Sequence, residues 1–239
     1  MSLLSVEGIN KHFGGLAAVS RLDLQVGKGE VVGLIGPNGA GKTTLFNLLS
    51  GALKPNAGVI RFREENITGL KPDQICRKGL ARTFQSVKVF GGMSATRNVL
   101  VGALFGDHGR VSVGQADAEA ARLLEFVGLS AFGGVPAKDL TLANQKRLEV
   151  ARALATKPEL LLIDELMAGL NPTEVAQAMD LVAAIRNQGT TVFIIEHVMK
   201  AIMSICDRII VLHHGEKIAE GTPQEIATSR TVIEVYLGE

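Results

Sequence analysis

The 239-residue sequence contains no tryptophan and only one tyrosine, so it lacks the aromatic platforms on which single-stranded nucleic acids stack. It has no excess of basic charge either, because 25 lysines and arginines balance 24 aspartates and glutamates. No long run of basic residues appears along the chain. Bulk electrostatics therefore gives no support to binding of DNA or RNA.

Cysteine is scarce as well, and Cys76 and Cys206 stand far apart in the sequence. We expect two ordinary thiols in a reducing compartment rather than a disulfide or a metal site. The amino-terminal residues lack a basic segment followed by a long apolar one, so no signal peptide is expected. No uncharged apolar stretch approaches the length that spans a bilayer. We therefore expect any membrane association to depend on a partner protein.

Hydrophobic residues, in contrast, make up 46% of the chain, which is ample for a sizeable core. Apolar runs at 160–163 and 190–195 suit buried strands, and amphipathic patterns at 145–156 and 172–187 suit helices. Alternation of such strands and helices predicts an α/β fold with a parallel sheet covered on both faces.

Two other regions depart from this alternation. Between Leu4 and Val26 apolar and polar residues alternate with the period of a half-buried strand, which predicts strands of an edge sheet. From 95 to 129 the chain is rich in alanine and leucine at helical spacing. This segment predicts a helical subdomain inserted between strands of the core.

The clearest motif is a glycine-rich loop that fits the pattern G-x-x-x-x-G-K-[ST] at every fixed position. An apolar run at 30–35 precedes the loop and a helical pattern at 44–50 follows it. Glycines let backbone N–H groups point at phosphate oxygens, and the helix offers its positive end to the same anion. The predicted nucleotide-binding residues are Gly36, Pro37, Asn38, Gly39, Ala40, Gly41, Lys42, Thr43 and Thr44.

Hydrolysis of a bound triphosphate needs further groups. We expect Lys42 to reach the β- and γ-phosphates and the Thr43 hydroxyl to ligate Mg²⁺. Asp164 and Glu165 directly follow the apolar run at 160–163, where open parallel sheets place their ligands. Adjacent side chains at a strand end point in different directions. We therefore expect Asp164 to hold Mg²⁺ through water and Glu165 to polarise the attacking water.

Three other residues are weaker candidates on the sequence alone. His197 follows the apolar run at 190–195 and is a candidate contact for the γ-phosphate, although single histidines usually have structural roles. Gln85 follows Thr83-Phe84, but polar residues at strand ends are routine. Phe13 precedes a Gly-Gly turn, where its ring could stack on a base, but composition alone favours an ordinary core or turn aromatic.

Together these segments resemble the nucleotide-binding domain of ATP-binding cassette (ABC) transporters over nearly the whole chain. The matching elements, in order, are Phe13, the loop 36–44, Gln85, the signature region 140–144, Asp164-Glu165, Gly169-Leu170-Asn171 and His197. The resemblance implies a single domain over 1–239: a nucleotide-binding core with a parallel sheet, an edge antiparallel β-subdomain and a helical subdomain over about 86–157.

The same resemblance implies roles for individual residues. Phe13 would stack on adenine, and Gln85 would join the Mg²⁺ shell while sensing the membrane subunit. Glu165 would be the catalytic carboxylate, with Lys42 and His197 contacting phosphates. The implied ligands are ATP and Mg²⁺.

Finer features are similar to one branch of the family, the ATP-binding subunits of branched-chain amino acid importers, and within it to the first of two paired ATPases. These features are Arg82-Thr83-Phe84-Gln85, Ala168-Gly169-Leu170-Asn171-Pro172, Ile195-Glu196-His197 with Met199, and Tyr236-Leu237-Gly238-Glu239. ATP-binding subunits of urea and other amide importers look similar, so the resemblance leaves those solutes as alternatives.

The resemblance implies a peripheral protein at the cytoplasmic face of the membrane, bound through polytopic permease subunits. A second ATP-binding subunit would complete a heterodimer, or a second copy a homodimer. A periplasmic or surface solute-binding protein would take part indirectly. Two alternatives remain: a soluble ABC ATPase acting on nucleic acid or ribosomes, and a nucleotide-dependent regulatory subunit with little turnover.

The sequence departs from the family pattern at two places. The signature L-S-x-G-Q, whose Ser and Gly touch the γ-phosphate held by the opposite subunit, is replaced here by Leu140-Thr141-Leu142-Ala143-Asn144. Ala143 adds a methyl where Gly permits close backbone approach. Leu166 stands where the family has Pro, which loosens the turn after Glu165. Because such sites are shared between two subunits, we predict one competent and one impaired site in a heterodimer.

Overall fold

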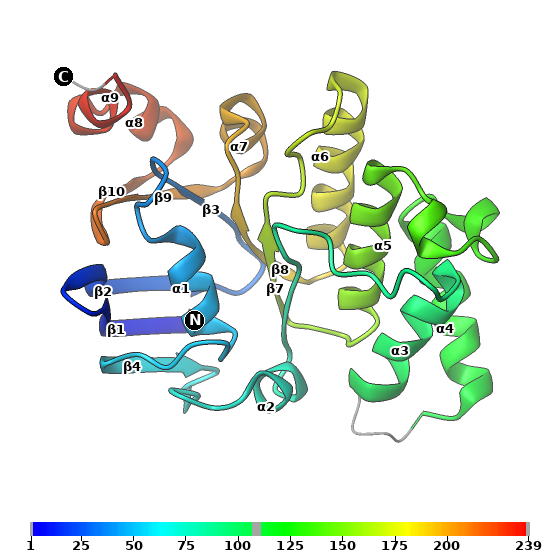
Figure 1. Ribbon diagram of the computed structural model, residues 1–239. Helices are drawn as coiled ribbons and strands as arrows, with labels where there is room; N and C mark the ends of the chain where they lie inside the picture. The colour runs from blue at the N-terminus through cyan, green and yellow to red at the C-terminus, as the bar shows by residue number, and fades with distance from the viewer. Residues whose placement is uncertain (1, 107–110, 238–239) are drawn as a thin grey trace.

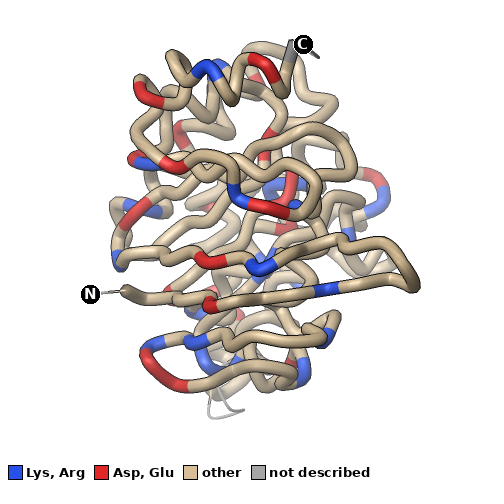
Figure 2. The backbone as a smooth tube through the Cα atoms, turned by 90° about the vertical axis from the view of Figure 1, so that its left-hand side faces the viewer, with Lys and Arg blue, Asp and Glu red and all other residues tan. Residues whose placement is uncertain are grey.

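Two β-sheets organise the computed structural model, which describes residues 2–106 and 111–237 (Figure 1). The larger sheet has six strands in the order β10-β9-β3-β8-β7-β6, and the smaller has four in the order β2-β1-β4-β5. Acidic and basic residues are interspersed on the face shown in Figure 2 rather than gathered by sign.

The larger sheet is parallel except at one edge, where β10 runs antiparallel to β9. Every residue of β3, β7 and β8 is buried, as expected for strands covered on both faces. The strands are β3 (Val31–Ile35), β6 (Leu80–Arg82), β7 (Leu160–Asp164), β8 (Thr191–Ile195), β9 (Arg208–His213) and β10 (Glu216–Gly221).

The smaller sheet is antiparallel throughout. Its strands are β1 (Ser2–Phe13), β2 (Leu16–Gly27), β4 (Ala57–Phe62) and β5 (Glu65–Asn66). Towards the end of β2, Leu22 and Leu24 are buried while Asp23 is exposed, so the predicted period-2 pattern faces the core on one side only.

Helices cover both faces of the larger sheet. They are α1 (Lys42–Leu49), α2 (Pro72–Arg77), α3 (Ala95–Gly106), α4 (Val113–Phe126), α5 (Leu142–Leu154), α6 (Pro172–Asn187), α7 (Met199–Ile205), α8 (Pro223–Thr228) and α9 (Arg230–Leu237), with short 3₁₀ turns at Ser130–Phe132 and Ala137–Asp139. Helices α3, α4 and α5 lie together on the side away from the smaller sheet (Figure 1). The predicted fold class is confirmed. No helix in the described ranges is long and apolar enough to cross a bilayer.

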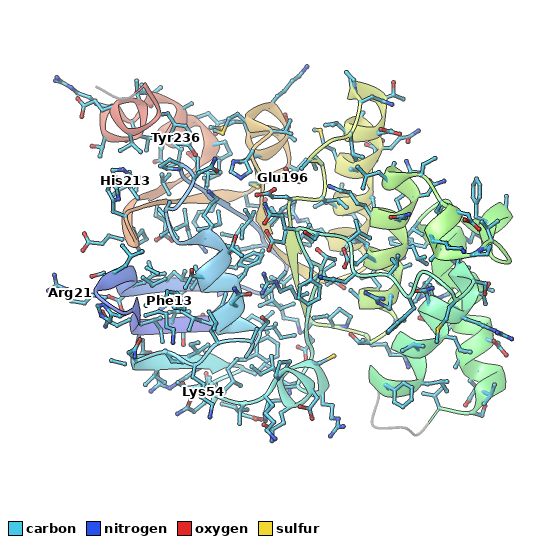
Figure 3. The ribbon with its side chains drawn as sticks, viewed as in Figure 1. Phe13, Arg21, Lys54, Glu196, His213 and Tyr236 are labelled. Carbon is cyan, nitrogen blue, oxygen red and sulfur yellow. The ribbon has the colours of Figure 1, made fainter. Side chains whose placement is uncertain are left out.

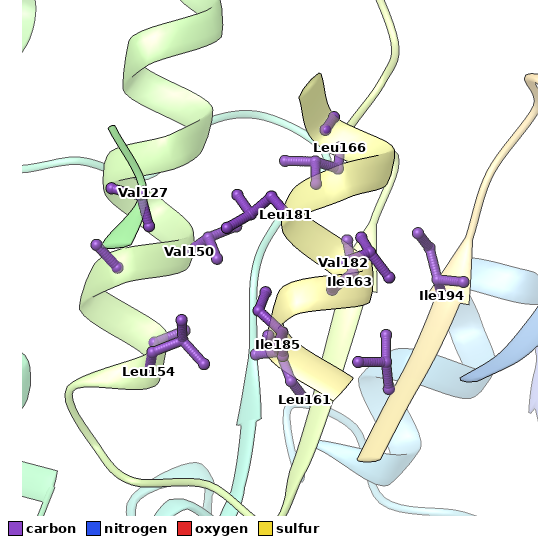
Figure 4. Packing of buried hydrophobic residues seen from close by; sticks show 14 of the residues in the cluster. Val127, Val150, Leu154, Leu161, Ile163, Leu166, Leu181, Val182, Ile185 and Ile194 are labelled. Carbon is purple, nitrogen blue, oxygen red and sulfur yellow. The ribbon is translucent and has the colours of Figure 1, made fainter. Parts of the chain in front are cut away.

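The larger sheet separates two hydrophobic layers. Along β7, Leu161 and Ile163 face one layer with α5 and α6, whereas Leu160 and Leu162 face the other. Figure 4 shows Leu161 and Ile163 close to α6 in the first layer. This strict alternation on a strand buried on both faces explains why its sequence is apolar throughout.

One predicted boundary and one missed strand need correction. The helix expected from residue 145 begins at Leu142, because the Thr141 hydroxyl accepts a hydrogen bond from the Asn144 amide at 3.3 Å and caps the helix. The last three residues of the signature region, 142–144, therefore form the first turn of α5. No bounds were predicted for the short strand β6, since three residues are too few to show a period.

Candidate functional site

The predicted phosphate loop joins β3 to α1 beyond the carboxyl edge of the larger sheet. Its glycines at 36 and 41 have φ values of 149° and 102°. A Cβ added to Gly36 would lie 2.1 Å from the Leu212 carbonyl oxygen, and one on Gly41 would lie 2.4 Å from that of Ala18. No side chain fits at either position, so the path of the loop depends on both glycines.

The turn between β9 and β10 supports this loop from outside. The Gly215 amide donates a hydrogen bond to the Ala40 carbonyl at 3.0 Å, and the Gly215 carbonyl accepts one from the Ser20 amide at 2.9 Å. The loop is therefore fixed between the carboxyl end of β9 and strand β2, which holds its backbone in one conformation.

Lys42 is buried at the start of α1 and folds back over its own loop. Its ammonium donates hydrogen bonds to the carbonyls of Gly36 at 2.6 Å and Pro37 at 3.0 Å. Burial lowers the pKa of Lys42, while the charges of Glu165 and Asp164 oppose that shift. A phosphate in the loop would compete with these carbonyls for the ammonium. The adjacent Thr43 is exposed at the same helix end.

Asp164, the last residue of β7, is 2% exposed and lies against Arg82 of the neighbouring strand β6. The Arg82 guanidinium donates to Oδ2 of Asp164 at 2.9 Å. Burial raises the pKa of Asp164, and the guanidinium beside it works in the opposite direction. The other oxygen, Oδ1, is buried without a protein hydrogen-bond partner. A buried acceptor without a partner is uncommon in proteins, and this oxygen is therefore available to a further ligand.

Arg82→Met should destabilise the protein by about 3 kcal/mol, because it leaves the Asp164 charge buried and unpaired. Thermal unfolding of the full chain measures the loss. Arg63→Met is the matched control, since it removes a guanidinium from an exposed ion pair with Glu159, worth less than about 1 kcal/mol. Equal losses in the two variants would contradict a special role for the buried pair.

Glu165 has its two carboxylate oxygens held by side chains from different strand ends. The Gln85 amide donates to Oε2 at 3.0 Å, and Nε2 of His197 lies 2.8 Å from Oε1. Gln85 follows β6, Glu165 follows β7 and His197 follows β8, which are neighbours in the sheet. The structure thus brings together three residues that the sequence proposed separately, and it orients the carboxylate of Glu165.

Phe13 and the signature region lie apart from this cluster. Phe13 ends β1 with its side chain 48% exposed, and the Lys11 ammonium lies 5.3 Å from its ring centroid. Figure 3 shows Phe13 on the smaller sheet and Glu196 by the end of β8. Thr141 and Ala143 lie at the start of α5, well away from α1 (Figure 1).

Two functional candidates escaped the sequence analysis, Lys146 and Glu196. Lys146 shares a buried helical stripe with Ala143, Val150 and Ala153, so a charged residue on an apolar helix face was the available signal. Glu196 is buried at the end of β8, beside the more conspicuous His197. Both contact the turn that follows Glu165, as described below.

A family model described as "ABC transporter" matches residues 19–168, and one described as "Branched-chain amino acid ATP-binding cassette transporter" matches residues 216–239. The chain is 44% identical to the high-affinity branched-chain amino acid transport ATP-binding protein LivG of Escherichia coli (strain K12), with 99% of this chain and 98% of the relative covered.

Solved structures agree with the sequence matches. A nucleotide-free ATP-binding cassette from an ABC transporter superposes with a TM-score of 0.90 at 30% identity, covering all of both chains. The ADP conformation of an ATP-binding cassette of an ABC transporter superposes with a TM-score of 0.89 at 31% identity, again over all of both chains.

Proposed function

We propose, because the chain belongs to the ABC transporter family, that it is the ATP-binding and ATP-hydrolysing subunit that powers import of branched-chain amino acids. The observation that carries the hydrolytic part is the meeting of Gln85, Glu165 and His197 beside the phosphate loop. The choice of solute rests on the 44% identity to a branched-chain amino acid transport protein over nearly the full length.

In this proposal the loop 36–44 cradles the phosphates of ATP, and the Lys42 ammonium exchanges its loop carbonyls for phosphate oxygens. Glu165 polarises the attacking water, and its hydrogen bonds to Gln85 and His197 hold the carboxylate in place for that task. His197 contacts the γ-phosphate, and the exposed ring of Phe13 stacks on adenine.

The residues present also fit Mg²⁺. A hard divalent cation prefers carboxylate, hydroxyl and amide oxygens, and the Oδ1 atom of Asp164 is a buried carboxylate oxygen without a partner. Asp164 through water, the Thr43 hydroxyl and the Gln85 side-chain oxygen would hold the ion. When bound, it would neutralise charge on the phosphate oxygens.

The membrane partner has a candidate docking place beside Gln85. A groove with a volume of about 550 Å³ is lined by Phe84, Phe90 and Phe105 together with residues of α2, α3 and α5. All three rings are substantially exposed, and exposed aromatic side chains gathered in one groove are typical of protein interfaces. We propose that a cytoplasmic segment of a polytopic permease subunit fills this groove and holds the protein at the cytoplasmic face of the membrane.

Two such ATP-binding subunits would meet face to face, each lending its signature region to the other's nucleotide. A heterodimer with a second ATP-binding subunit is the arrangement proposed for this chain, and a solute-binding protein delivers the amino acid from outside. A soluble ATPase acting on nucleic acid or ribosomes is not favoured, because the full-length relative is a transport protein.

Reconstitution tests the proposal. The chain, its second ATP-binding subunit, the permease subunits and the solute-binding protein are placed in proteoliposomes with ATP on the cytoplasmic side. We expect ATP-dependent uptake of labelled leucine, isoleucine or valine, and no uptake with a non-hydrolysable ATP analogue. Uptake of urea without leucine would refute the solute, and absence of phosphate release would refute the ATPase.

A further inference from the structure

Lys146 lies on the buried face of α5 and is only 6% exposed. Its ammonium donates hydrogen bonds to two backbone carbonyls of the turn after β7, that of Glu165 at 2.7 Å and that of Ala168 at 2.7 Å. Lysine is almost never buried this fully unless it is paired, because both its charge and its rotamer freedom are costly to confine. The lysine therefore closes the turn that carries Glu165 from the side of α5.

A second buried residue holds the same turn from the side of β8. The carboxylate of Glu196 accepts a hydrogen bond from the Met167 amide at 2.6 Å. The Glu165 amide donates to the Ile195 carbonyl at 2.9 Å. Glu165 itself has φ of +53°, a conformation that residues other than glycine keep only where their surroundings impose it. The imposed conformation aims the Glu165 side chain at Gln85 and His197.

The sequence of the turn makes these contacts necessary. Leu166 follows Glu165, and a leucine leaves φ free where a proline would fix it near −65°. Leu166 is buried, so packing keeps its side chain in place, but the path of the backbone from 165 to 168 depends on its hydrogen bonds. Lys146 supplies two of those bonds through a single ammonium.

Helix α5 touches the same segment at a second point, one turn earlier. A Cβ on Gly169 would lie 3.3 Å from Cδ2 of Leu142, so the side chain of Leu142 packs on the end of the turn. Leu142 is the first residue of α5 and belongs to the signature region. Because a helix is stiff over one turn, a shift of its start would be passed to Lys146 and on to the Glu165 carbonyl.

We propose that Lys146 is a positioning residue that couples the two nucleotide sites. It ties the Glu165 turn of this chain's own site to the helix whose start serves the opposite site. This inference rests on the proposed function, in which each signature region is donated to the partner's nucleotide. Movement of α5 against the partner's ATP thereby adjusts the carboxylate of Glu165.

The test is Lys146→Met in the assembled transporter, which keeps the length and apolar stem of the side chain and removes its donor. We expect kcat for ATP hydrolysis to fall about 10- to 100-fold, since misplacement of a reacting group by about 1 Å can cost up to about 100-fold. The KM for ATP should stay within about 2-fold, because the phosphate loop is untouched. Lys146→Arg, which keeps a charged donor, should recover most of the activity.

Arg147→Met is the matched control, because Arg147 is the next residue on α5 and its guanidinium donates a hydrogen bond to the exposed Gln177 side chain, away from the turn after Glu165. It should leave kcat unchanged. Lys146→Gln, measured alongside with thermal unfolding of every variant, keeps the test valid if the methionine variant does not fold. The inference is overturned if kcat of the folded Lys146 variants stays within about 2-fold of wild type, or if KM rises in parallel with the fall in kcat. A wild-type complex without phosphate release would instead refute the proposed function.

Discussion

Replacing Glu165 with Gln should lower ATP turnover of the assembled transporter by about 10³-fold, while its affinity for ATP stays unchanged. A glutamine keeps the size of the side chain and can still accept one of the two hydrogen bonds that Gln85 and His197 now make with the carboxylate. It cannot take a proton from water, so the loss falls on the chemical step. Binding through the loop 36–44 does not involve this side chain.

Phosphate release at saturating ATP measures the chemical step, and calorimetric titration with ATP measures binding. Asp180→Asn provides the control, because it neutralises an exposed carboxylate on α6 and should leave both quantities unchanged. Turnover above about a tenth of wild type in Glu165→Gln would contradict the role of Glu165 as the group that activates water.

Much of the fold could be predicted from local sequence, but some helices and strands were predicted more accurately than others, for physical reasons. Helix α6 was predicted at both of its ends from its amphipathic pattern. In the structure Pro172 is its first residue, Asn171 caps it and Gly189 follows it. The buried strands β7 and β8 were evident from their apolar runs. The start of α5 was missed because Thr141 is a weaker signal than a proline, and β6 was too short for any periodic pattern.

In the candidate site, too, some residues are marked by local sequence, whereas the contacts between them are not. Lys42, Asp164 and Glu165 could be proposed from the sequence because a motif or a strand end marks each one locally. The contacts of Glu165 with Gln85 and His197 join residues 80 and 32 positions apart, and they depend on the strand order β6-β7-β8. Strand order cannot be derived from local patterns, so these contacts required the structure.

The second large effect concerns inequality between the two nucleotide sites. Lys42→Ala in this chain should lower turnover of the heterodimeric transporter by more than about 100-fold, because it removes a charge that stabilises the transferring phosphate. The equivalent substitution in the partner should cost less than about 3-fold. The partner's loop would be completed by this chain's stretch 141–144, in which Ala143 and Asn144 replace the family's Gly and Gln.

Ala143 is only 6% exposed, and Leu142 beside it is 47% exposed, so substitutions here alter packing within the chain as well as contact with a partner. Ala143→Gly and Asn144→Gln are introduced together into the Lys42→Ala variant. In this variant only the partner's site hydrolyses ATP, so any change in phosphate release reports on that site. We expect phosphate release to rise several-fold, by about the factor that one restored electrostatic contact supplies.

Thermal unfolding of the same variants separates this gain from any change in stability, because a glycine inside the first turn of α5 should slightly lower the unfolding temperature. Higher turnover in a slightly less stable variant cannot be explained by a gain in stability. We would then assign it to a better contact between 141–144 and the nucleotide bound by the partner. Equal losses from the two lysine substitutions, or brisk hydrolysis by a homodimer of this chain, would contradict the inequality. The outcome decides whether the departures in 141–144 weaken one site of the transporter or are compensated by the partner.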